Sequence, residues 1–213
     1  MTRIVAGTAG GRRLQVPGAG TRPTSDRVRE ALFSRLEHQG IVVGANVLDL
    51  YAGSGAVGLE AASRGAERVT LVESSRDAVE VCRRNATNLG LDAQVTVVHA
   101  KAERFVQTIS PEPWDLVLLD PPYDLEDSEL AAVLAGVVPS LAPAAIVVVE
   151  RSARSREPEW PSGLVEIGGG EYQAGDFLER LDAFSRQTNI KFTITISADI
   201  ETATDGIRKY FMD

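Results

Sequence analysis

The chain has 213 residues, of which 44% are hydrophobic and 24% charged, and it carries a formal net charge of −8. This composition supports a globular domain with a proper core, and it excludes both a chain that is disordered throughout and a protein that coats nucleic acid indiscriminately. A single cysteine, Cys82, excludes an internal disulfide framework, and residues 1–7 lack the apolar stretch of a signal peptide, so we expect a cytoplasmic protein.

The first 35 residues are strongly basic although the chain as a whole is acidic. They hold seven arginines but only two acidic residues, Asp26 and Glu30. A basic segment on an acidic body is typical of a protein that contacts nucleic acid through one face, although a solvated arginine-rich surface would give the same pattern. The candidate contacts are Arg3, Arg12, Arg13, Arg22, Arg27 and Arg29.

A helix is predicted next. Thr24, Ser25 and Asp26 are good N-caps, and apolar residues recur at helical spacing from there as far as Gly40. We therefore treat residues 1–40 as a basic N-terminal arm and helix. The predicted core face comprises Val28, Ala31, Leu32 and Leu36, and the other faces display Arg27, Arg29 and Arg35.

From residue 46 the sequence alternates between short apolar runs and amphipathic segments. Strands that alternate with helices and are apolar on both faces indicate a doubly wound α/β fold with a mostly parallel sheet covered on both sides. Ser74 and Asp77 are predicted to form a capping box at the start of one helix. The predicted strands are 46–51, 68–73, 94–99, 114–120 and 145–150, and the predicted helices are 56–64, 75–89, 102–109 and 127–138.

A run without charged residues, 130–149, is long enough to raise the question of a membrane span. Pro139, Ser140 and Pro143 divide this run. We therefore interpret it as a core helix followed by a buried strand, and we expect no membrane segment.

The pattern changes after residue 167. Three consecutive glycines, 168–170, predict a flexible joint, and a helix at 176–187, a strand at 191–197 and a weaker helix at 199–211 are predicted beyond it. The sequence leaves open whether this atypical C-terminal tail, 168–213, closes the sheet of the domain 41–167 or forms an appendage.

A glycine-rich loop follows the first predicted strand. Gly53, Gly55 and Gly58 have the spacing G-x-G-x-x-G between a strand and a helix, which lets the backbone approach a ligand closely. Glu73 ends the second strand, where a carboxylate can accept both ribose hydroxyls. Asp49 would sit poorly beside a pyrophosphate but can bind the α-ammonium of a methionine moiety. The combination favours S-adenosylmethionine over NAD, and the alternative is a structural glycine turn with incidental acids.

The stretch Asp120-Pro121-Pro122-Tyr123 follows the fourth predicted strand, so it should face the same cavity as the glycine loop. The Asp120 carboxylate and the Pro121 carbonyl can accept both hydrogens of an exocyclic ring amine, which aims the nitrogen lone pair at a methyl donor. The prolines hold that carbonyl rigidly, and Tyr123 offers a stacking surface for a flipped base. The alternative is a turn cap followed by a packing tyrosine.

The chain resembles the bacterial RsmD-type methyltransferases, which modify N2 of a guanine in small-subunit ribosomal RNA. The resemblance extends from about residue 2 to 167, and its most specific stretch is RPTSDRVREALF, residues 22–33. It implies a class I methyltransferase fold, which is Rossmann-like, with S-adenosylmethionine as donor, residues 120–123 as the amine site and the arm as an RNA contact. The other matching segments are 3–7, 11–14, 48–61 and 120–123.

Two departures from this family are visible. Many related methyltransferases place an acid after the third strand to hold the adenine amino group, whereas this chain has Ala100-Lys101-Ala102, so we expect backbone groups or Glu103 to serve instead. The tail does not match the family's short closing strand. We assign the catalytic role to Asp120, Pro121, Pro122 and Tyr123, cofactor binding to Asp49, Tyr51, Gly53, Ser54, Gly55, Glu73 and Ala102, and no residue to a metal.

The primary hypothesis is a guanine-N2 methyltransferase that acts as a monomer on 16S ribosomal RNA or on a partly assembled small subunit. Three rivals are considered. One is a DNA adenine-N6 methyltransferase, because the amine site suits that amine equally well. The others are a non-catalytic RNA-binding assembly factor that retains the fold, and an NAD-dependent dehydrogenase.

Overall fold

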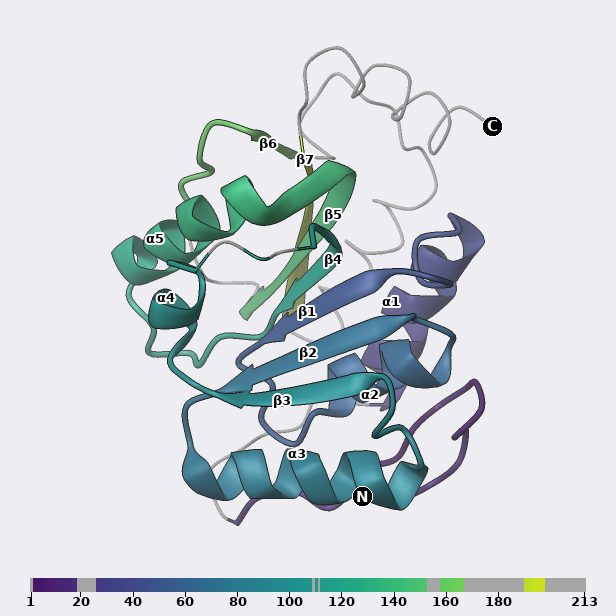
Figure 1. The fold of residues 1–213 in the computed structure, drawn as a ribbon. Helices are drawn as coiled ribbons and strands as arrows, with labels where there is room; N and C mark the ends of the chain where they lie inside the picture. The colour runs from purple at the N-terminus through teal and green to yellow at the C-terminus, as the bar shows by residue number, and fades with distance from the viewer. Residues whose placement is uncertain are drawn as a thin grey trace.

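The computed structural model describes residues 2–18, 26–108, 110, 112–152, 158–166 and 190–197. Helices and strands alternate through most of the chain (Figure 1). The strands are β1 (Asn46–Leu50), β2 (Arg68–Glu73), β3 (Val95–His99), β4 (Trp114–Leu119), β5 (Leu141–Ser152), β6 (Leu164–Glu166) and β7 (Ile190–Ser197). The helices are α1 (Asp26–His38), α2 (Ala56–Ser63), α3 (Arg76–Leu89), α4 (Ala102–Phe105), α5 (Asp127–Val137) and the 3₁₀ turn η1 (Val138–Ser140).

The strands form one sheet in the order β3-β2-β1-β4-β5-β7-β6. The first five strands are parallel to their neighbours, and β7 runs antiparallel between β5 and β6. The doubly wound α/β fold is confirmed. Because the chain order reverses between β1 and β4, the carboxyl ends of those strands flank the crevice where such sheets bind ligands.

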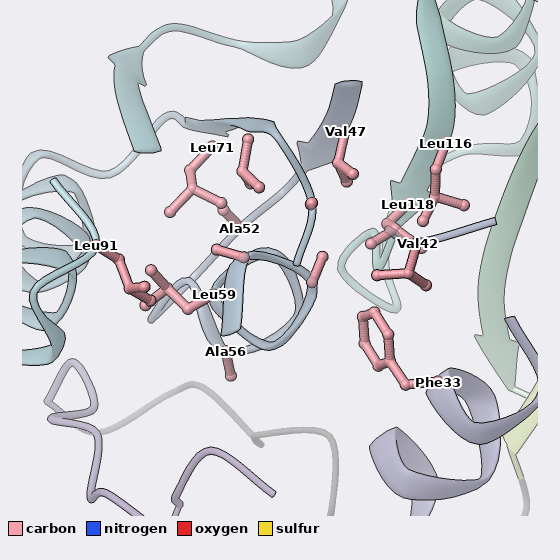
Figure 2. Close-up of a cluster of buried hydrophobic side chains, with 14 of the residues drawn as sticks. Phe33, Val42, Val47, Ala52, Ala56, Leu59, Leu71, Leu91, Leu116 and Leu118 are labelled. Carbon is pink, nitrogen blue, oxygen red and sulfur yellow. The ribbon is translucent and has the colours of Figure 1, made fainter. Parts of the chain in front are cut away.

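Helices cover both faces of the sheet (Figure 1). On one face, α1, α2 and α3 pack on alternate residues of the central strands, such as Val47, Leu71 and Leu118. Figure 2 shows part of this cluster, with Phe33 of α1 pointing toward the sheet. On the other face, α4 and α5 pack on the intervening strand residues, among them Leu119. Apolar residues on both sides of each strand are the reason for the continuous hydrophobic runs in the sequence.

The N-terminal arm is part of the same core. Ile4, Ala9 and Leu14 are buried in the cluster that contains α1 and α2. The buried carboxylate of Glu60 on α2 accepts hydrogen bonds from the backbone N–H groups of Val5 and Ala6, at 2.8 and 2.9 Å. Backbone hydrogen bonds and buried apolar side chains therefore hold the arm against the sheet domain.

Two local predictions are wrong. The N-cap of α3 is Ser75, whose hydroxyl accepts a hydrogen bond from the N–H of Ala78 at 3.4 Å, so Ser74 and Asp77 do not form the predicted capping box. In α1, the buried face is formed by Val28, Arg29, Leu32, Phe33 and Leu36, and Ala31 is exposed. The i, i+4 rows that begin at positions 28 and 29 face the sheet, which leaves position 31 on the solvent side.

The uncharged run 130–149 divides as predicted, into the end of α5, the turn η1 and most of β5. None of the helices within the described ranges has the length and hydropathy needed to cross a membrane. In the tail, the predicted strand at 191–197 is confirmed as β7, which extends the sheet beside β5. The predicted joint at 168–170 and the helices at 176–187 and 199–211 lie outside the described residues.

Candidate active site

The glycine loop connects β1 to α2 at the carboxyl edge of the sheet. Its backbone needs positive φ at Tyr51, Gly53 and Gly55, with values of 65°, 57° and 79°. The third glycine of the motif serves packing, because an added Cβ at Gly58 would lie 2.3 Å from Cδ2 of Leu71. At Gly53, no described atom lies within 4 Å of an added Cβ, so open space borders the loop there. The loop is thus closely packed on the sheet side and open on the other.

Asp49 lies directly beneath this loop. Its side chain is buried, and Oδ2 accepts a hydrogen bond from the N–H of Gly58 at 2.8 Å. Burial raises the pKa of Asp49 to about 8, helped by the charges of Asp120 and Glu73 and opposed by the hydrogen bond from Gly58. A cation bound beside Asp49 would stabilise its ionised form, so this position suits a positively charged ligand group.

Glu73 holds the glycine loop in place. One carboxylate oxygen accepts a hydrogen bond from the N–H of Gly53 at 2.8 Å, and the other accepts one from the N–H of Ser75 at 2.7 Å. The buried thiol of Cys82 donates to the carbonyl of Gly53 at 3.1 Å, and burial raises its pKa. Since Glu73 is only half-buried, it combines a fixed orientation with access to a ligand.

The remaining predicted cofactor residues surround the loop. The carbonyl of buried Ser54 accepts a hydrogen bond from Asn85 at 2.9 Å, which fixes the loop backbone. Half-buried Tyr51 packs with the cluster that contains Ala102. Burial, and the charges of Glu103 and Glu129, raise the pKa of Tyr51. Among the described residues its hydroxyl is buried without a hydrogen-bond partner.

The predicted amine site follows β4. Asp120 is half-buried and Pro121 is buried, whereas the side chain of Tyr123 is 70% exposed. The N–H of Leu125 donates to the carbonyl of Pro122 at 3.0 Å, which closes a turn beyond the two prolines. The exposed tyrosine is therefore available as a stacking surface, and Asp120 points into the cavity described next.

One cavity contains Asp49 and Asp120 together, and the glycine-loop helix α2 contributes Val57 to its wall. The predicted juxtaposition of the glycine-loop region and residue 120 is therefore present. Two further charged residues line this cavity, Arg29 from α1 and Glu150 from β5. Sequence analysis gave neither residue a role in the site, although the position of Glu150 at the end of a predicted central strand was a usable signal.

The predicted nucleic-acid contacts differ in their surroundings. The expectation that α1 displays Arg29 is wrong, because this side chain is fully buried, with Nη2 donating to the carbonyl of Arg3 at 2.5 Å and to Asp26 at 2.9 Å. A buried guanidinium needs such partners, so we withdraw Arg29 as a surface contact. Arg12 donates to the carbonyls of Asn88 and Leu89 at the end of α3. Arg3, Arg13 and Arg27 are exposed, and Arg22 lies outside the described residues.

No group of three or more potential metal ligands occurs within the part of the chain that the structure describes. The charged residues of the cavity are carboxylates and one guanidinium, from four different elements of the fold. Its chemistry is therefore that of hydrogen bonding and charge complementarity.

The strand order, the glycine loop over Asp49 and the acidic residue at the end of β4 together define the class I methyltransferase fold. A solved structure from Escherichia coli named "Putative methyltransferase yhhF" superposes with a TM-score of 0.72 and 29% identity, over 92% of this chain and 97% of that one. A family model described as "Conserved hypothetical protein 95" matches residues 2–177. The chain belongs to this family, and the resemblance to RsmD-type methyltransferases is confirmed.

Two curated relatives carry the name "Ribosomal RNA small subunit methyltransferase D". The one from Haemophilus influenzae is 36% identical over 154 residues, which cover 70% of this chain and 77% of the relative. The one from Escherichia coli is 42% identical over 122 residues, and this match covers 57% of the chain and 60% of the relative. The family match ends ten residues beyond the expected limit of 167, so most of the tail lies outside it.

Proposed function

We propose that this protein transfers a methyl group from S-adenosylmethionine to the exocyclic N2 amine of a guanine in 16S ribosomal RNA. The single observation that carries this proposal is the shared cavity of Asp49 and Asp120 at the carboxyl edge of β1 and β4. Membership of the family and the names of the curated relatives support RNA of the small ribosomal subunit as substrate.

The residues around the glycine loop fit the donor. Asp49 is a buried carboxylate whose elevated pKa falls when a cation such as an α-ammonium binds next to it. Glu73 is held at the loop with its carboxylate partly accessible, as a ribose ligand requires. The open space at Gly53 lets a ligand approach the backbone. Bound there, S-adenosylmethionine would supply an electrophilic methyl group on its sulfonium sulfur.

The chain's own residues would then prepare the nucleophile. Asp120 accepts one hydrogen of the target amine, and the carbonyl of Pro121 accepts the other, so the nitrogen lone pair is directed toward the donor. Tyr123, which is exposed in the absence of RNA, stacks on the extruded base. The cationic product loses its proton readily after transfer, so no strong base is needed.

We place the reaction in the cytoplasm, with the protein acting as a monomer on the RNA or on a partly assembled subunit. The exposed arginines of the arm, Arg3, Arg13 and Arg27, are proposed to bind RNA phosphates. The adenine ring would be held by backbone groups near Ala102 and by Glu103.

The test is transfer of labelled methyl from S-adenosylmethionine to unmodified 16S RNA, small subunits and duplex DNA, with digestion to nucleosides to identify the product. We expect N2-methylguanine from RNA or subunits only. Asp120→Ala should lower turnover at least about 100-fold, because it removes an acceptor from the transition state. Asp124→Ala, an exposed residue on the following turn, is the matched control. Methylated adenine in DNA, or full turnover by Asp120→Ala, would refute the proposal.

A further inference from the structure

A second carboxylate stands beside Asp120 in the cavity. Leu118 of β4 pairs with Val148 of β5 in parallel register, so Asp120 and Glu150, two residues further along each strand, reach the same level. All four side chains line the cavity. Residues i and i+2 of a strand point to the same face, which explains why both carboxylates lie on the α1 side of the sheet.

The two carboxylates are held in comparable environments. Both are half-buried, and neighbouring strands separate them by about 4.8 Å at the backbone. The fully buried side chain of Arg29 lines the same cavity from α1, and its positive charge offsets part of the repulsion between them. The cavity therefore presents two adjacent acceptors to a ligand that enters from the carboxyl edge.

This pair of acceptors matches one edge of guanine. Guanine carries two adjacent donors, the N2 amine and the N1–H, whereas the amine of adenine is next to an unprotonated N1 that can only accept. A carboxylate is an acceptor only, so it attracts the guanine pattern and repels the adenine N1. We propose that Glu150 is a specificity-determining residue, which accepts the N1–H of the target guanine while Asp120 holds the N2 amine. This inference rests on the proposed function.

The test uses Glu150→Gln and two RNA substrates. The nucleotide that the wild-type protein methylates is first located in the small subunit, and subunits are then rebuilt with either guanine or 2-aminopurine at that position. 2-Aminopurine keeps the amine on C2 but has an unprotonated N1. The wild type should prefer guanine about 10- to 100-fold, as expected for one charge-assisted hydrogen bond. Glu150→Gln should lose guanine turnover by a similar factor and gain on 2-aminopurine, because its amide can donate to N1.

Three controls separate the outcomes. Glu67→Gln makes the same chemical change at the exposed amino end of β2 and should leave the preference unchanged. The dissociation constant for S-adenosylmethionine and the unfolding temperature should match the wild type in both variants. Equal losses on both bases, or weaker cofactor binding by Glu150→Gln, would overturn the specificity role while leaving the proposed function intact. Absence of methyl transfer by the wild type to any RNA would overturn both.

Discussion

Asp49→Asn is expected to stabilise the cofactor-free protein while weakening cofactor binding. Burial moves the pKa of Asp49 from its ordinary value of 3.8 to about 8. Between these values the folded protein keeps a proton that the unfolded chain has released. The folded state then binds more protons, so its stability falls as the pH rises from about 4 to about 8. The native aspartate is therefore a source of instability at neutral pH.

The magnitude follows from the same values. At pH 7, about three pH units above the ordinary pKa, the contribution reaches an upper limit on the order of 4 kcal/mol. Asparagine keeps an oxygen that can accept the hydrogen bond from Gly58 and has no charge to desolvate. The variant should therefore exceed the wild type in stability by up to about 4 kcal/mol at pH 7 to 8, and the difference should vanish toward pH 4.

The assay is urea unfolding of both proteins at several pH values from 4 to 8, without cofactor. The difference between the two free energies cancels the titration of the other groups, and Asp124→Asn, an exposed aspartate, is the control. Calorimetry should find that S-adenosylmethionine binds the variant at least about 10-fold more weakly, because the charge partner of the ammonium is lost. A stability difference that does not change with pH, or unchanged cofactor affinity, would refute the reasoning.

Two further predictions concern the N-terminal arm. Arg12→Ala should cost about 1 kcal/mol of stability, because its guanidinium binds the last carbonyls of α3, whereas Arg13→Ala should leave stability unchanged and reduce the salt dependence of RNA binding. Equal stability losses in the two variants would contradict this division. Glu60→Gln should cost about 3 to 5 kcal/mol in chemical unfolding and make the first residues sensitive to protease, because it removes a buried charge that binds Val5, Ala6 and Arg64. A stable, protease-resistant variant would show that the arm is held by its apolar residues alone.

The sheet domain was predictable because each of its signals is local. A strand, a glycine turn and a helix are encoded within a few residues, and the boundaries of β2 agree with the prediction at both ends. The meeting of Asp49 and Asp120 was also predictable, because the carboxyl ends of central parallel strands always share one edge. The topology alone therefore brings these two carboxylates together, without any knowledge of side-chain conformation.

The burial of Arg29 could not be predicted from local pattern. An arginine on a helix is normally a solvent residue, and its partners Asp26 and the Arg3 carbonyl lie on the near side of the chain while Glu60, 3.9 Å from its Nε, belongs to another helix. Only the folded arrangement supplies enough acceptors for a buried guanidinium. Ala31 was misplaced for the same reason, since it took the core position that Arg29 occupies.

The helix α2 explains why the arm and the cofactor loop are linked. Seven of its eight residues are buried, so neither side of the helix faces solvent. The Gly58 side packs on Leu71 and binds Asp49, whereas Glu60 and Ser63 bind the backbone of the arm. A polar residue on such a helix marks the seat of another segment. Any variant of the arm therefore changes the support of the glycine loop, and RNA-binding measurements on arm variants must be accompanied by cofactor affinity to separate the two effects.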